Sequence, residues 1–79
     1  MYLRSLEDAE VMKETIDECE GSVWLENETD IYDLKSAVSQ YVGIARLFDK
    51  DNSLELFASS KADEVRLVRM LRQNPQMAC

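Results

Sequence analysis

The sequence predicts a single small α+β domain, in which helices alternate with short strands. Three segments carry apolar side chains at steps of three and four residues, which is the spacing of an amphipathic helix. Between them lie short runs that are rich in β-branched and aromatic residues, or that alternate apolar with polar, as strands do. The chain has 79 residues, which is room for one hydrophobic core.

The first part of the chain predicts a very short strand followed by a helix. Residues 1–4 are an apolar-rich start, and residues 5–8 (SLED) fit a capping box, in which hydroxyl and carboxylate satisfy amides of the first helical turn. We expect the helix to end at Gly21, in the left-handed conformation that ends many helices. Its stripe of apolar residues at helical spacing comprises Ala9, Met12, Ile16 and Cys19.

The middle of the chain predicts a β-hairpin and a second helix. Residues 23–26 and 31–34 are β-prone runs separated by a polar stretch of hairpin length. We expect Ser36 to cap a helix that continues to about Leu47. The apolar positions that follow a helical period there are Val38, Tyr41, Val42, Ala45 and Phe48.

The last part of the chain predicts one more strand and one more helix. Residues 54–58 alternate apolar with polar for most of their length, and residues 60–63 (SKAD) repeat the capping-box pattern. The helix that follows should reach about Arg72. Its expected inner stripe consists of Val65, Val68 and Leu71.

These elements occur in the order βαββαβα. Two crossovers and a hairpin in that order build a four-stranded antiparallel sheet with three helices on one face, an open-faced sandwich. The only proline, Pro75, opens residues 74–79, which we expect to be a disordered tail. The predicted domain therefore spans residues 1–73.

The charge of the chain is acidic and unevenly distributed. With 16 acidic and 9 basic side chains the net charge is −7, which repels nucleic-acid phosphates and anionic lipid surfaces. Residues 1–34 hold 11 of the acidic and 2 of the basic side chains. We therefore expect neither nucleic acid nor a membrane as partner. Because no apolar run resembles a membrane span or a signal sequence, we expect a cytoplasmic protein.

The sequence offers little for catalysis. It contains no histidine, which excludes a Ser-His-Asp or Cys-His arrangement. Its acidic segment, residues 26–33, lacks the pattern of a calcium loop, and its two glycines form no phosphate loop. Cys19 and Cys79 lack the spacing of a zinc site. We expect no enzymatic activity, no metal and no cofactor; the alternative is a thiol-dependent or enzyme-accessory protein that uses Cys19 or Cys79.

Two features have both a plain and a functional interpretation. Trp24 points away from the side of its strand that carries Val23 and Leu25, so it either packs under a helix or marks an exposed sheet face. An exposed tryptophan would suggest an interface. A basic stripe on the last helix is either solvated or a site for an anion or acidic partner, and it consists of Arg66, Arg69 and Arg72.

Residues 23–36, which end in Leu34-Lys35-Ser36, and residues 62–64 (ADE) resemble the HPr phosphocarrier family. The first segment looks like the family's second and third strands leading into its L-K-S helix start, and the second like the opening of its final helix. The family carries phosphate on a histidine in a G-x-H-A-R-P loop before its first helix. Here Arg4 leads directly to the capping Ser5, without room for that loop. The resemblance therefore implies a member that cannot carry phosphate on histidine, with an N-terminally truncated phosphocarrier as an alternative.

The resemblance also implies which residues would act. The serine at the position of Ser36 is the target of a regulatory kinase in HPr proteins and their histidine-less relatives, and a helix N-terminus favours a phosphoserine; a plain N-cap is the alternative. The helix that follows is the one that the family uses to contact partners. Val38, Tyr41 and Val42 are therefore candidate interface residues, or else core-facing ones. The expected function is a non-catalytic regulatory or protein-interaction module of a bacterial phosphotransferase-type system, with a protein as its partner.

Overall fold

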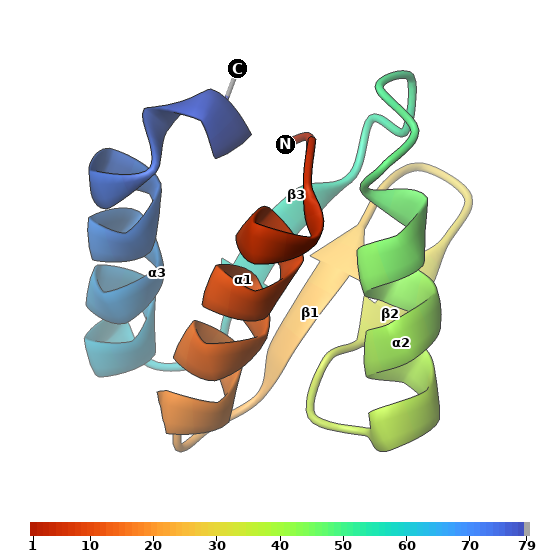
Figure 1. Ribbon diagram of the computed structural model, residues 1–79. Helices are drawn as coiled ribbons and strands as arrows, with labels where there is room; N and C mark the ends of the chain where they lie inside the picture. Colours follow the sequence, from red (N-terminus) through yellow and green to blue (C-terminus); the bar gives the residue numbers. More distant parts are fainter. Residues whose placement is uncertain (79) are drawn as a thin grey trace.

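The computed structural model describes residues 1–78, which form three α-helices packed on one face of an antiparallel sheet (Figure 1). The α+β class predicted from the sequence is confirmed. The helices are α1 (Leu6–Glu18), α2 (Ala37–Arg46) and α3 (Lys61–Gln73), the strands are β1 (Val23–Glu26), β2 (Ile31–Asp33) and β3 (Glu55–Ala58), and a 3-10 turn, η1 (Pro75–Met77), follows α3.

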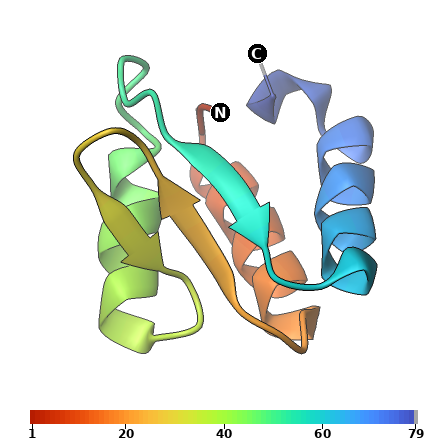
Figure 2. The ribbon, with the colours of Figure 1, turned by 180° about the vertical axis from the view of Figure 1, so that it is seen from behind.

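The sheet is built around β1, which pairs antiparallel with both of its neighbours in the order β2-β1-β3. Figure 2 shows the sheet from its uncovered face, with the helices behind it. Val23 and Leu25 are fully buried under the helices, and the alternation of side chains along a strand places Trp24 and Glu26 on the uncovered face.

The strand expected at residues 1–4 does not form, so the sheet has three strands within residues 1–78 instead of four. The backbone of this segment is engaged by other elements. The N–H of Tyr2 donates to the carbonyl of Met77 at 3.0 Å, and the N–H of Leu3 donates to the carbonyl of Leu47 at 2.9 Å. Leu3 is fully buried, so the segment closes the core at the end of α2 and beside η1.

Residues 74–78 are ordered, in contrast to the disordered tail that we expected. Pro75 ends the run of α3, but it also fits the start of η1, where its missing N–H costs no hydrogen bond. Met77 is fully buried, and the amide of Gln76 donates to Asp8 Oδ1 at 3.1 Å. Burial of Met77 therefore offsets the cost of ordering this segment. Cys79 lies outside the described residues.

The stripe predicted for α1 is confirmed, but its end is not where we placed it. Met12, Ile16 and Cys19 are buried, and α1 ends at Glu18. Gly21 does not adopt the left-handed conformation. Its small size is needed for another reason, because a Cβ there would meet Ser59 Oγ at 2.8 Å.

On α2, the face that packs on the sheet is not the one that we considered as core-facing. Gly43 and Leu47 are buried, whereas Val38 and Tyr41 are 76% and 78% exposed. A Cβ on Gly43 would meet Tyr32 Cβ at 3.0 Å. The missing side chain at this position lets α2 lie close against β2.

The inner stripe predicted for α3 is wrong at Val65 and Val68, whereas Leu71 is partly buried and packs against the core as expected. The buried residues of α3 are Asp63, Leu67 and Met70, whereas Val65 and Val68 are about half exposed. The first buried position of α3 is a carboxylate, so a pattern of apolar residues alone could not place this helix.

Asp63 joins the end of α1 to the start of α3. Its fully buried carboxylate accepts the N–H of Gly21 at 2.8 Å, the N–H of Glu20 at 3.2 Å and the guanidinium of Arg66 at 2.8 Å. The bond from Gly21 is the largest influence on the pKa of Asp63, and with the other donors it lowers that pKa to about 2 although burial opposes the shift.

Lys35 closes the carboxyl end of α1 from the other side. Its Nζ donates to the carbonyls of Ile16 at 3.0 Å and Cys19 at 2.7 Å. The last turn of α1 has no basic residue of its own, so Lys35 supplies the cation that a helix C-terminus favours.

The lowered pKa of Asp63 predicts an acid-sensitive fold. A folded-state pKa of about 2 lies below the ordinary value of 3.8, so the ionised carboxylate contributes stability that is fully present well above pH 3.8 and is lost as the pH falls from there towards 2. Asp63→Asn should be less stable at neutral pH and should lose less stability on acidification than the wild type. Urea unfolding from neutral pH to about pH 3 measures both effects. Glu14→Gln, on the exposed side of α1, is the charge-matched control; equal pH dependence in both variants would contradict the role of Asp63.

Candidate functional site

A groove of about 600 Å³ runs between α1 and α2. In Figure 1 the two helices lie next to each other on the covered face of the sheet. Polar residues at the groove are confined to Glu10, Lys13 and Gln40. Its apolar lining comes from both helices and from the end of α2, and it consists of Leu6, Ala9, Ala37, Tyr41, Ile44, Ala45 and Phe48.

Large apolar side chains on this surface are unusually exposed. Leu6 and Tyr41 are 77% and 78% exposed, and Phe48 is partly exposed. Val38 and Val42, one step around α2 from the groove, are exposed as well. An exposed apolar surface of this kind is typical of a site that binds a partner.

The outer face of α2, which we define as Ala37, Val38, Tyr41, Val42 and Ala45, carries no charge. The only charged residue of α2 is Arg46, and its guanidinium is turned towards β2. There it donates to Tyr32 Oη at 2.6 Å and to Asp30 Oδ2 at 3.4 Å. The surface around the groove on the α2 side is therefore apolar without charged interruption.

The charged residues of α1 that line the groove are Glu10 and Lys13, one of each sign. Lys13 is the only basic residue of α1, and it pairs with Asp17 at 3.4 Å. The other exposed acidic residues of α1, which do not line the groove, are Glu7, Glu14, Asp17 and Glu18. A ligand would thus meet an excess of negative charge only where it extends past the groove over the exposed surface of α1.

Ser36 occupies the N-cap position of α2, but its hydroxyl makes no cap hydrogen bond. By contrast, Ser5 Oγ accepts the N–H of Asp8 at 3.1 Å and Ser60 Oγ accepts the N–H of Asp63 at 3.2 Å. Ser36 is exposed and is joined directly to Ala37 and Val38. The structure therefore brings the candidate phosphorylation site and the candidate interface residues to one end of the outer face of α2.

Cys19 has the surroundings of an unreactive thiol. It is 3% exposed, and its Sγ lies 3.3 Å from the carbonyl of Thr15. Burial raises the pKa of Cys19, and the nearby carboxylate of Asp63 raises it further. Because the thiolate is the reactive form, this environment disfavours a nucleophilic Cys19. The second cysteine, Cys79, is not among the described residues.

Residues 1–78 contain no group of three or more cysteine, aspartate or glutamate side chains placed to hold a metal ion. Likewise, no helix in this part of the chain has both the length and the apolar character that crossing a membrane requires.

Of the residues that line the groove, only Tyr41 was identified from the sequence as a candidate interface residue, and the exposed large apolar residues that were missed are Leu6 and Phe48. Leu6 precedes Glu7 and Asp8 at the start of α1, and Phe48 follows the end of α2. Both lie at helix ends, where periodicity carries the least information. Only the packing of α1 beside α2 brings them to one surface.

The free hydroxyl of Ser36 predicts a difference between two N-cap serines. Ser60→Ala removes a cap hydrogen bond and should cost about 1 kcal/mol, whereas Ser36→Ala should change the free energy of unfolding by less than about 0.5 kcal/mol. Urea unfolding of both variants measures this. If Ser36→Ala lowered the free energy of unfolding as much as Ser60→Ala does, Ser36 would be shown to act as a cap in solution.

No protein-family model matches the chain, and neither a curated protein nor a solved structure is significantly similar to it. The resemblance to HPr proteins rests on the short motifs within residues 23–36 and 62–64 and on the order of elements predicted from the sequence. A function for this chain has to be inferred from its own surfaces.

Proposed function

We propose that the chain is a non-catalytic protein-interaction module that binds an amphipathic helix of a partner protein in the groove between α1 and α2. The observation that carries this proposal is the uncharged outer face of α2, which exposes Val38 and Tyr41, with Tyr41 lining the same groove as Leu6. A groove between two helices, lined by apolar side chains, is a common site for the apolar face of a third helix.

The charge of the groove specifies the partner further. Its α2 wall is neutral, its α1 wall holds Glu10 and Lys13, and the exposed surface of α1 beyond the groove is acidic. A helix whose apolar stripe is flanked by lysine or arginine on one side would place its apolar residues in the groove and its basic residues over that acidic surface. Such charge complementarity favours correct orientation and rapid association more than it adds affinity, which would come from the apolar contacts.

The resemblance to HPr proteins supports a place for this module in a bacterial phosphotransferase-type system in the cytoplasm. Without histidine the chain would act there by binding and not by carrying a phosphoryl group. Ser36 would then be the regulatory position. Phosphate on its exposed hydroxyl would add negative charge at the end of the outer face of α2.

Binding in the groove is testable with a designed peptide of about four helical turns, made of leucine and lysine in an amphipathic helical pattern. The peptide should bind the wild type more tightly than a scrambled peptide of equal composition, and Tyr41→Ala should weaken binding about tenfold. Isothermal titration calorimetry gives the affinities, and amide chemical shifts locate the site.

The control for the peptide experiment is Val68→Ala, which removes a half-exposed valine from α3, away from the groove. It should bind the peptide as the wild type does. Equal affinity for the helical and scrambled peptides would show attraction by charge alone, and an equal loss in both variants would show that binding is not specific to the groove. Either result would overturn the proposal.

A regulatory role for Ser36 predicts an effect of charge that a plain cap does not. Ser36→Asp should bind the leucine-lysine peptide several-fold more tightly, because the added carboxylate faces a basic ligand. Ser36→Asn is the neutral control of similar size. Affinities that are equal for Ser36→Asp, Ser36→Asn and the wild type would exclude a switch at this residue.

A further inference from the structure

The uncovered face of the sheet is a second surface with its own chemistry. No helix of the described residues lies over it (Figure 2). The three strands contain aromatic and acidic residues but neither lysine nor arginine. The side chains that strand alternation places on this face are Trp24, Glu26, Ile31, Asp33, Glu55 and Phe57, which we define as the open sheet face.

An aromatic pair lies at the centre of the open sheet face. Trp24 and Phe57 are direct cross-strand partners, and their rings are stacked with centroids 5.8 Å apart and an interplanar angle of 21°. The indole N–H of Trp24 donates to Glu26 Oε1 at 3.0 Å, which fixes this carboxylate beside the rings. Phe57 remains 38% exposed, so the pair presents apolar surface to a ligand.

Two carboxylates on this face oppose each other. Glu26 of β1 is the direct cross-strand partner of Glu55 of β3, and like charges in this position destabilise a sheet. None of the ion pairs within residues 1–78 involves either glutamate. A cation placed between them would relieve this repulsion.

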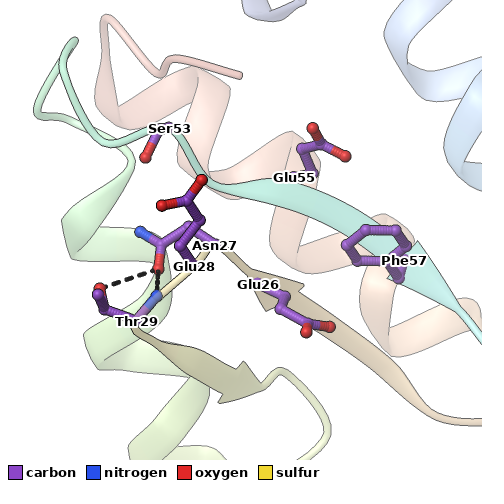
Figure 3. A pocket seen from close by; sticks show the side chains of 7 residues that line it. All are labelled: Glu26, Asn27, Glu28, Thr29, Ser53, Glu55 and Phe57. Carbon is purple, nitrogen blue, oxygen red and sulfur yellow. Dashed lines mark hydrogen bonds between the residues drawn. The ribbon is translucent and has the colours of Figure 1, made fainter.

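The space beside these groups is open and broad. A hollow of about 510 Å³ is lined by Glu26, Glu28, Glu55 and Phe57, together with polar side chains of the β1–β2 turn and the segment before β3. Figure 3 shows that the carboxylates of Glu26 and Glu55 are spread along the sheet and do not converge on one point. This spacing fits an extended organic cation better than a single metal ion.

We propose that the open sheet face binds an arginine-rich segment of a partner protein, with one guanidinium stacked against the Trp24–Phe57 pair and hydrogen-bonded to Glu26, and a second guanidinium paired with Glu55. A guanidinium is planar, stacks on aromatic rings and donates to more than one carboxylate at once. A lysine ammonium can pair with the carboxylates but does not stack in the same way. This site lies on the opposite side of the sheet from the groove between α1 and α2, and it does not depend on the function proposed for that groove.

Binding at this site can be followed by tryptophan fluorescence, because Trp24 is the only tryptophan of the chain. A blocked Gly-Arg-Gly-Arg-Gly peptide should change the fluorescence of Trp24 in a saturable manner. The lysine equivalent should bind about tenfold more weakly, and spermidine should also bind more weakly than the arginine peptide. The preference of the site for arginine over lysine separates stacking from simple charge attraction.

Two variants test the contacts. Glu55→Gln removes one carboxylate, and because it also removes the cross-strand repulsion it should fold at least as well as the wild type. The affinity of Glu55→Gln for the arginine peptide should be several-fold lower than that of the wild type. Phe57→Leu should reduce the preference for the arginine peptide over the lysine peptide. Glu64→Gln, an exposed residue of α3, removes the same charge away from the sheet and should leave binding unchanged.

Three results would overturn the proposal. The first is equal affinity for arginine and lysine peptides. The second is an equal loss in Glu55→Gln and Glu64→Gln, which would show attraction by net charge only. The third is binding that leaves the fluorescence of Trp24 and the amide chemical shifts of β1 and β3 unchanged, which would place the peptide elsewhere.

Discussion

The buried carboxylate of Asp63 is the interaction on which the rest of the fold depends. It accepts two backbone amides from the turn after α1 and the guanidinium of Arg66, so it fixes where α1 ends, where β1 begins and how α3 starts. These segments are more than 40 residues apart in the chain, with Gly21 and Asp63 separated by 42. Gly21 belongs to the same contact, because a side chain there would displace Asp63 Oδ2 and Ser59 Oγ. The three elements therefore share one buried polar junction.

The second constraint is the close approach of α2 to the sheet. Gly43 permits it, since a larger residue would meet Tyr32 and Leu34. The inner side of α2 consists of the buried Gly43 and the partly buried Ile44, with Leu47 buried directly after the helix. Val38 and Tyr41 are left exposed as a result. The surface that we propose for a partner is thus a consequence of the way in which the core is packed.

The sequence predicts the local parts of this fold better than the distant ones. The order of helices, the hairpin and the buried stripe of α1 follow from periodicity and capping, which are properties of neighbouring residues. The segment at residues 1–4 and the turn at residues 75–77 could not be predicted, because what orders them is the contact between Tyr2 and Met77 at opposite ends of the chain. On α3, the buried residues are Asp63, Leu67 and Met70, and the burial of Asp63 depends on its bonds to Glu20 and Gly21, which are distant in the sequence.

The candidate site could be predicted only in part, for a related reason. Val38, Tyr41 and Val42 stand out in the sequence, but α2 has apolar residues on both faces, so periodicity cannot decide which face is buried. Leu6 lines the same groove as Tyr41 only because the fold places α1 next to α2. On the sheet, Trp24 could be placed on one side of its strand. Its stacking on Phe57 and the opposition of Glu26 to Glu55 depend on the register of β1 with β3.

The hydrogen bond between Tyr2 and Met77 has a consequence for the topology of the chain. It brings the first and last described segments together at one end of the domain, so a short peptide linker could join them with little entropic cost. A circular permutant that is opened instead in the polar turn between β1 and β2 would keep the Asp63 junction and all three strand segments. In such a chain the order of synthesis would change while the core contacts stayed the same.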